Sequence, residues 1–267
     1  MSGLRYLDAH CHIQFDWYDA DRDAVIAQME ERGVGGVVVG CDLESSKKAV
    51  ELAEKHDNLW AAIGLHPNEE PNEWFAPEPY RELAKSPKAV AIGECGLDYY
   101  RPEDTGEKAK RKQKNVLNDH LELAAELDLP LIIHSRPSKG TQDAYLDLIA
   151  LLAEAREKHP NLRGDIHFFV GGAEEMRALH ALGFTTSFTA VVTFARDYDA
   201  VIKAAPLEML LAETDAPFVA PASRRGQRND PLAIMEVAAK IAEIRGQDPE
   251  MARAALLANA RRLFKLD

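Results

Sequence analysis

The chain has 267 residues, which is enough for two small domains or for one large α/β barrel. Its composition, 46% hydrophobic and 28% charged, is ordinary for a soluble globular protein, and no apolar run is long enough to span a membrane. The formal net charge of −12 argues against a general nucleic-acid-binding protein, although it leaves room for a local basic patch.

The three cysteines, Cys11, Cys41 and Cys95, are widely separated and odd in number. This pattern favours a reducing compartment over a disulfide framework. With no secretory signal pattern at the N-terminus, we expect a cytoplasmic protein.

Strand-like runs alternate with helix-like segments along the whole chain. The predicted strands are Arg5–Ala9, Gly36–Val39, Trp60–Gly64, Ala89–Gly93, Leu131–Ile133, Gly164–Phe169, Thr185–Phe188 and Met209–Ala212. Between them, apolar residues recur at three- and four-residue spacings, as in the segment after Lys110, which predicts amphipathic helices. Ser45 and Ser46 are interpreted as a capped helix start.

Eight such repeats in about 250 residues have the size of a (β/α)₈ TIM barrel. The alternative architecture is an open doubly wound sheet, but no Gly-x-Gly-x-x-Gly follows the first strand. No linker-like stretch divides the chain, so residues 1–267 are predicted to form a single domain. Two Pro- and charge-rich stretches, Pro67–Pro79 and Pro217–Pro231, are interpreted as long loops after strands.

The first predicted strand runs into His10 and His12. In an extended chain, residues two apart point to the same side, so both imidazoles could hold one metal ion. On its own this His-x-His pattern is a weak signal, and it gains weight only if other ligands meet it.

Four further candidate ligands lie at or near the carboxyl ends of other predicted strands, where the active sites of barrels are built. They are Glu94, His134, His167 and Asp215. Each alone has an ordinary structural explanation, such as a turn aspartate before proline or a capping carboxylate. Together, four histidines and two carboxylates predict two divalent metal ions, with a carboxylate such as Glu94 bridging them.

The motifs resemble those of the TatD family of metal-dependent deoxyribonucleases, in the amidohydrolase superfamily. The matching segments are Asp8–His12, Gly64–Pro67, Gly93–Tyr99, Ile133–Arg136, Glu213–Pro217 and Asn259–Phe264. The resemblance runs nearly end to end and implies a (β/α)₈ barrel, a divalent metal centre and hydrolysis of DNA phosphodiester bonds. The glutamate at position 94 favours this branch over related enzymes with a carboxylated lysine there.

Four positions depart from the family pattern: Gln14, Pro137, Phe168 and Val170. Gln14 stands where an aspartate is common, and Phe168 and Val170 replace a small thiol and a hydroxyl after the ligand histidine. These changes leave the metal site intact and bear on substrate specificity.

On this basis, we expect His10, His12 and Asp215 to hold one metal ion. His134 and His167 hold the second, and Glu94 bridges the two; magnesium, manganese, zinc and nickel are all open. We assign catalysis to Glu94 and Asp215, with Asp215 orienting or deprotonating a metal-activated water that attacks phosphorus.

Three residues are assigned to substrate. His66 and Arg136 would contact the scissile phosphate, and His66 could equally cap the loop after the third strand. Arg225 belongs to the basic stretch Arg224–Asn229, which directly follows the Asp215 strand; a second basic run, Lys108–Lys114, more simply forms a solvated helix face.

The predicted activity is that of a 3'–5' deoxyribonuclease with a single-stranded DNA or DNA-end substrate and no membrane partner. Another metal-dependent hydrolase, acting on a lactone, a small phosphoester or an aminoacyl-tRNA ester, is the main alternative, because fold does not settle substrate. A non-enzymatic binding protein is the third, and the intact Glu94 and Asp215 argue against it.

Overall fold

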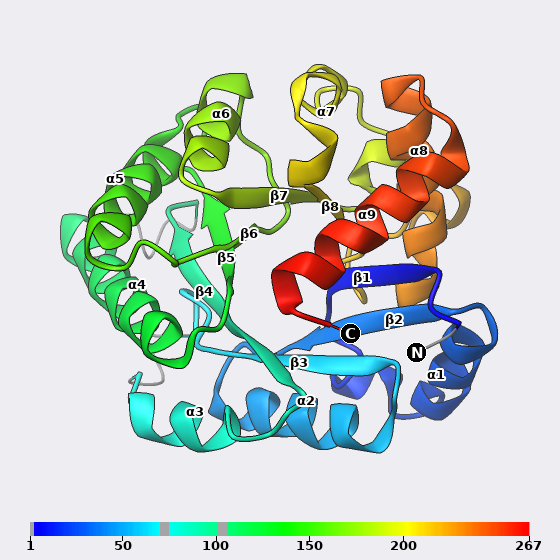
Figure 1. Cartoon of the computed structure of the whole chain (residues 1–267), viewed down its shortest axis with the longest axis horizontal. Helices are drawn as coiled ribbons and strands as arrows, with labels where there is room; N and C mark the ends of the chain where they lie inside the picture. Colours follow the sequence, from blue (N-terminus) through cyan, green and yellow to red (C-terminus); the bar gives the residue numbers. More distant parts are fainter. Residues whose placement is uncertain (1–2, 70–74, 101–105, 267) are drawn as a thin grey trace.

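The computed structural model describes residues 3–69, 75–100 and 106–266, which form a single-domain barrel of eight parallel strands (Figure 1). The strands are β1 (Tyr6–Cys11), β2 (Val34–Val39), β3 (Leu59–Ile63), β4 (Ala89–Asp98), β5 (Leu131–Arg136), β6 (Gly164–Ile166), β7 (Phe184–Phe188) and β8 (Leu210–Ala212). Each pairs with the next in parallel, in the order β1 to β8.

Hydrogen bonds between β1 and the segment after β8 join the two edges of the sheet. The amide of Asp215 donates to the carbonyl of His10 at 2.9 Å, and the amide of His12 donates to the carbonyl of Ala216 at 2.7 Å. The predicted barrel is therefore confirmed, and the open doubly wound sheet is excluded.

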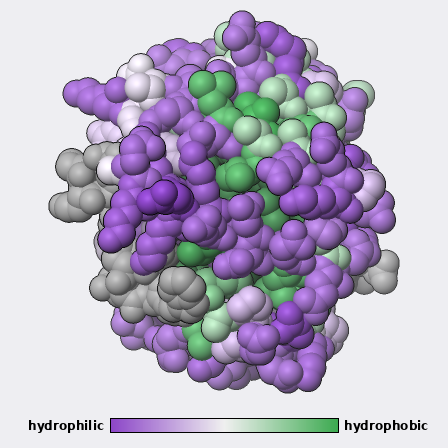
Figure 2. All heavy atoms as spheres, turned by 90° about the vertical axis from the view of Figure 1, so that its left-hand side faces the viewer, coloured by the Kyte–Doolittle hydropathy of each residue, from purple (hydrophilic) through white to green (hydrophobic). Residues whose placement is uncertain are grey.

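Helices surround the strands, with α9 crossing one end of the barrel (Figure 1). They are α1 (Arg22–Glu31), α2 (Leu43–Lys55), α3 (Pro77–Leu83), α4 (Glu107–Leu127), α5 (Asp143–Lys158), α6 (Ala173–Ala181), α7 (Asp199–Ala204), α8 (Ile234–Arg245) and α9 (Pro249–Phe264). The side of the molecule that carries α4 and α5 is mostly hydrophilic, with hydrophobic residues showing through in a broken band (Figure 2). Among the described residues, none of the helices has the length and hydrophobicity that crossing a membrane requires.

Several element boundaries differ from the sequence-based expectation. Helix α2 begins earlier, because Asp42 and not a serine is its N-cap: its carboxylate accepts the amide of Ser45 at 2.6 Å. The expected loop Pro67–Pro79 already contains the start of α3 at Pro77, and its residues 70–74 lie outside the described residues.

Strand β4 continues five residues beyond its predicted end at Gly93. Gly93 and Gly96 have φ of +147° and +142°, and both lie tightly against β5. A Cβ atom at Gly93 would be 2.4 Å from the carbonyl oxygen of Ile132, and one at Gly96 would be 2.0 Å from that of His134. The glycines look like a strand end in sequence, but they let β4 and β5 approach closely.

The amino end of the barrel is closed by α9. Its Asn259 side chain donates to the carbonyl of Leu207, in the turn before β8, and to that of Leu210, the first residue of β8. Leu263 and Phe264 are buried in an apolar cluster with strand residues that include Leu7 and Ile132. This leaves the opposite, carboxyl end of the strands free to carry a site.

Candidate metal centre

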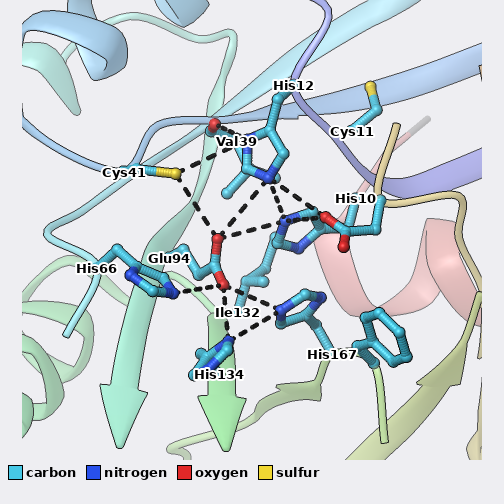
Figure 3. A network of polar contacts seen from close by, with 12 residues as sticks. His10, Cys11, His12, Val39, Cys41, His66, Glu94, Ile132, His134 and His167 are labelled. Carbon is cyan, nitrogen blue, oxygen red and sulfur yellow. Dashed lines mark hydrogen bonds and ion pairs between the residues drawn. The ribbon is translucent and has the colours of Figure 1, made fainter. Parts of the chain in front are cut away.

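Glu94 on β4 is the centre of a cluster of imidazoles at the carboxyl end of the barrel (Figure 3). Its two carboxylate oxygens face different partners. Oε2 lies 3.4 Å from Nε2 of His10 and 3.8 Å from Nε2 of His12. Oε1 lies 2.9 Å from Nε2 of His167 and 3.1 Å from Nδ1 of His134. The carboxylate therefore joins two groups of nitrogen donors.

Asp215 completes the group on the β1 side. Its Oδ1 lies 3.4 Å from Nε2 of His12 and 3.9 Å from Nε2 of His10. The Asp215 side chain is 13% exposed, compared with 4% for Glu94. Asp215 is thus the carboxylate of the cluster that solvent can reach.

The predicted ligands occupy slightly different places on their strands than expected. His10, Glu94 and His134 lie within β1, β4 and β5, not after them. His167 follows β6, because the chain turns away at Phe168, whose φ is +46°. The structure nevertheless brings all six predicted ligands together.

In His12 and His134, a hydrogen bond at one ring nitrogen fixes which nitrogen is available. Nδ1 of His12 lies 2.8 Å from the carbonyl of Val39, so it must donate, and in the neutral ring Nε2 carries the lone pair, 3.0 Å from Nε2 of His10. Nε2 of His134 lies 3.2 Å from a carboxylate oxygen of Asp98, which leaves Nδ1 for a metal. Such outer partners are typical of metal-ligating histidines.

His66 has the opposite arrangement. Its Nδ1 accepts the backbone amide of Asn68 at 3.1 Å, so the neutral ring carries its proton on Nε2, which lies 3.4 Å from Oε1 of Glu94. Burial lowers the pKa of His66 to about 3, so the ring is neutral near pH 7. His66 therefore faces the cluster as a hydrogen-bond donor, and it caps its own loop as well.

Two buried carboxylates behind the cluster were not among the predicted site residues. Asp98 holds His134, and Glu213 lies with Oε1 3.5 Å from Nδ1 of His167 while accepting the amide of Phe168 at 2.5 Å. The signal in the sequence is that both carboxylates lie inside the matching segments Gly93–Tyr99 and Glu213–Pro217.

A third buried carboxylate, Asp8, ties β1 to the segment that carries Asp215. It accepts the backbone amide of Thr214 at 2.8 Å, the Thr214 hydroxyl at 2.5 Å and the amide of His10 at 3.2 Å. Two ligand-bearing segments that are more than 200 residues apart in sequence are thereby held in one arrangement.

The electrostatics of the cluster favour an ionised Glu94. Burial alone would raise the pKa of Glu94, but attraction to the surrounding imidazoles outweighs it and holds the pKa well below its usual range. Deeper in the barrel, burial and the nearby Glu213 raise the pKa of Asp165 to about 7.

A cavity of about 490 Å³ opens over the cluster. It is lined by His66, Arg136 and every predicted ligand except His10, and its apolar side includes Phe168 and Val170. Cys41 also lines it, with Sγ 3.8 Å from Oε2 of Glu94.

Other predicted residues lie farther from the cluster. Arg225 is exposed, does not line the cavity, and stacks on Phe194 with its guanidinium carbon 4.0 Å from the ring centre. Gln14 is buried and donates to the carbonyl of Val39, the same oxygen that His12 contacts. The Lys108–Lys114 run lies on α4.

This fold and this donor set define a barrel hydrolase with a metal centre at the carboxyl ends of its strands. Comparison with known proteins gives the family. The model of the family described as TatD related DNase matches residues 7–265, and the chain belongs to this family of metal-dependent hydrolases.

Relatives of similar length span most of the chain. The metal-dependent hydrolase YabD of Bacillus subtilis, itself uncharacterized, is 37% identical over 97% of this chain and 99% of its own length. The 3'-5' ssDNA/RNA exonuclease TatD of Cronobacter sakazakii is 34% identical over 96% and 97%. The crystal structure of YJJV, a TATD homolog from Escherichia coli K12, superposes with a TM-score of 0.87 at 29% identity, over 98% of this chain and 99% of the other.

Proposed function

We propose that this protein is a metal-dependent deoxyribonuclease that hydrolyses single-stranded DNA from its 3' end. The observation that carries the proposal is the position of Glu94, between two groups of imidazoles at the floor of an open cavity. The substrate and the direction follow the activity named for the Cronobacter sakazakii relative.

The residues present fit a pair of divalent ions. Imidazole and carboxylate donors suit borderline metals such as zinc, manganese and nickel. The nitrogen atoms that face Glu94 belong to His10, His12, His134 and His167, and they lie 2.9 to 3.8 Å from its two carboxylate oxygens, so one carboxylate can share ions with both groups. His10, His12 and Asp215 would hold one ion, and His134 and His167 the other, with Glu94 shared between them.

Divalent ions in such a site lower the pKa of a bound water and neutralise charge that develops on a phosphate. The protein supplies the remaining chemistry. Asp215, with its exposed edge, can accept a proton from the attacking water. His66 can donate from Nε2 to a phosphate oxygen, because its other nitrogen is already occupied by Asn68. Arg136, at the cavity wall, can bind the next phosphate along the strand.

The test is an assay of metal-stripped protein, reconstituted in turn with magnesium, manganese, zinc and nickel, on DNA labelled at its 5' end. We expect stepwise shortening from the 3' end of a single strand, restored by metal and absent from a chelator control. A simple lactone and an aminoacyl ester are assayed in parallel. Hydrolysis of either, with intact DNA under every metal, would replace the proposal with a different esterase activity on the same site.

A further inference from the structure

Large exposed hydrophobic side chains are distributed unevenly over the described residues. Of six, four are aromatic, and each follows a strand at the carboxyl end of the barrel: Trp17 after β1, Tyr100 after β4, Phe194 after β7 and Phe218 after β8. The two aliphatic ones, Leu146 and Met251, lie on α5 and α9. Exposed aromatic residues gathered on one face indicate a binding surface.

On the β1 side, Trp17 and Phe218 form a pair next to the metal cluster. Their rings lie 6.1 Å apart at 65°, and Phe218 lines the cavity 6.2 Å from the ring of His12. Trp17 is 61% exposed and Phe218 is 43% exposed, so their faces are open to a ligand.

On the other side of the cavity, an arginine already lies over an aromatic ring. Arg136 on β5 stacks over Tyr100 with its guanidinium carbon 4.0 Å from the ring centre. In a barrel with strand order β1 to β8, β5 lies opposite β1. The Arg136–Tyr100 stack and the Trp17–Phe218 pair therefore flank the cavity from opposite sides, and Phe194 with Arg225 forms a second stack of the same kind.

The basic residues near this face are largely neutralised within the protein. Lys110 and Lys114 pair with Asp143 and Asp147, each at 2.7 Å. Arg224 pairs with Asp230, and Arg228 pairs with Asp21. A nucleic acid held here would depend less on a charged groove than on stacking, which is the second common means of binding single strands.

We propose that Trp17, Tyr100, Phe194 and Phe218, here called the aromatic rim, are stacking platforms for the bases of a single-stranded nucleic acid that flank the scissile phosphate. This inference rests on the proposed function and names how the substrate is held. Bases stack on aromatic rings and on guanidinium planes, and they can do so only when unpaired. The rim thereby selects single strands over duplexes without selecting a sequence.

The test compares oligothymidylate with the same oligomer carrying abasic residues on either side of the scissile phosphate. W17A and F218A should raise KM for oligothymidylate by about 5- to 150-fold each, since stacking is the interaction removed, with little change in kcat. The same variants should leave KM for the abasic oligomer unchanged. L146A is the matched control, because Leu146 is as exposed as Trp17, at 61%, and lies on α5; it should behave as the parent protein.

Binding is measured separately, by fluorescence anisotropy of labelled oligomer with metal-stripped protein. This measurement distinguishes the two proposals. If the parent protein hydrolyses no DNA with any metal but binds the normal oligomer more tightly than the abasic one, the proposed function is overturned and the aromatic rim is retained. Equal losses on abasic and normal oligomers, equal losses in L146A, or equal affinity of the parent protein for duplex and single strand would each overturn the rim.

Discussion

The two ends of the barrel differ in the side chains that they bury. At the amino end, α9 covers the strands with Leu263 and Phe264, and Asn259 satisfies carbonyls in the turn before β8 and at its first residue. At the carboxyl end, imidazole nitrogens are gathered 2.9 to 3.9 Å from the carboxylate oxygens of Glu94 and Asp215. The difference teaches that stability and chemistry are separated along the barrel axis, with apolar packing at the amino end and clustered polar donors at the carboxyl end.

The largest effect should come from the centre of the carboxyl end. E94Q keeps the shape of the side chain but removes the charge shared by the two imidazole groups, and we expect hydrolysis to fall by about a thousandfold or more. Thermal unfolding is measured alongside, because the low pKa of Glu94 means that its charge also contributes to stability, and the variant must be shown to fold. E174Q, at an exposed position on α6, is the control. An E94Q enzyme with parental activity would remove Glu94 from the mechanism.

The amino end should give the reverse result. F264A removes a buried aromatic ring, which is 3% exposed, and should lower the free energy of unfolding by about 3 to 5 kcal/mol. The kcat of the folded fraction should stay unchanged, as measured below the new unfolding transition. If F264A instead lost activity without loss of stability, the separation of stability from chemistry between the two ends would be contradicted.

A pH effect on stability should arise away from both ends, at His120 on α4. Nε2 of His120 accepts the amide of Leu65 at 3.0 Å and Nδ1 donates to the carbonyl of Val116 at 2.7 Å, so the folded protein needs the neutral ring. Burial lowers the pKa of His120 to about 4. The unfolded chain binds this proton more readily, so the stabilisation is complete above about pH 6.5 and falls as the pH drops towards 4, by up to about 3 kcal/mol.

Denaturant titrations of the parent protein and of H120Q across this range measure the His120 contribution as the difference between their pH slopes. Glutamine offers both hydrogen bonds but does not titrate. Identical slopes would show that His120 does not contribute.

The smallest effect should come from the outer carboxylates. D98N weakens the support of His134 while leaving every donor in place, and we expect metal affinity to fall by about 10- to 100-fold, measured by calorimetry on stripped protein. D147N, whose carboxylate contacts Tyr99 and Lys114 instead, is the comparison variant. Equal affinities for the two variants would limit Asp98 to a structural role.

Much of this molecule could be predicted from the sequence, because strand-ending histidines and carboxylates recur in register with the barrel repeat. The periodicity located all eight strands, and the predicted ligands lie where parallel strands converge. The periodicity could not predict which side chain contacts the outer nitrogen of each imidazole ring. Asp98 and Glu213 were visible in the sequence, but their partners are far away in the chain, His134 on β5 and His167 just after β6, so only the closed barrel pairs them.

The boundary errors have local physical causes. Predicted strand six reached Phe169, but the Phe168 amide bonds to Glu213 in place of a ladder partner, and the strand ends at Ile166. At α2, the residues that were interpreted as the cap include Ser45, which does take part: its hydroxyl receives the amide of Asp42 at 3.0 Å, three residues from the true N-cap carboxylate.

The close approach of β4 to β5 at Gly96 makes the candidate metal centre sensitive to substitution of a residue that is not one of its predicted ligands. Any side chain at this position would meet the carbonyl oxygen of His134 and force the two strands apart. The spacing between Glu94 and the imidazole on β5 is thus set by the absence of a methyl group. A random-mutation screen for folded variants that no longer retain metal should therefore recover glycine positions of β4 alongside the donors themselves.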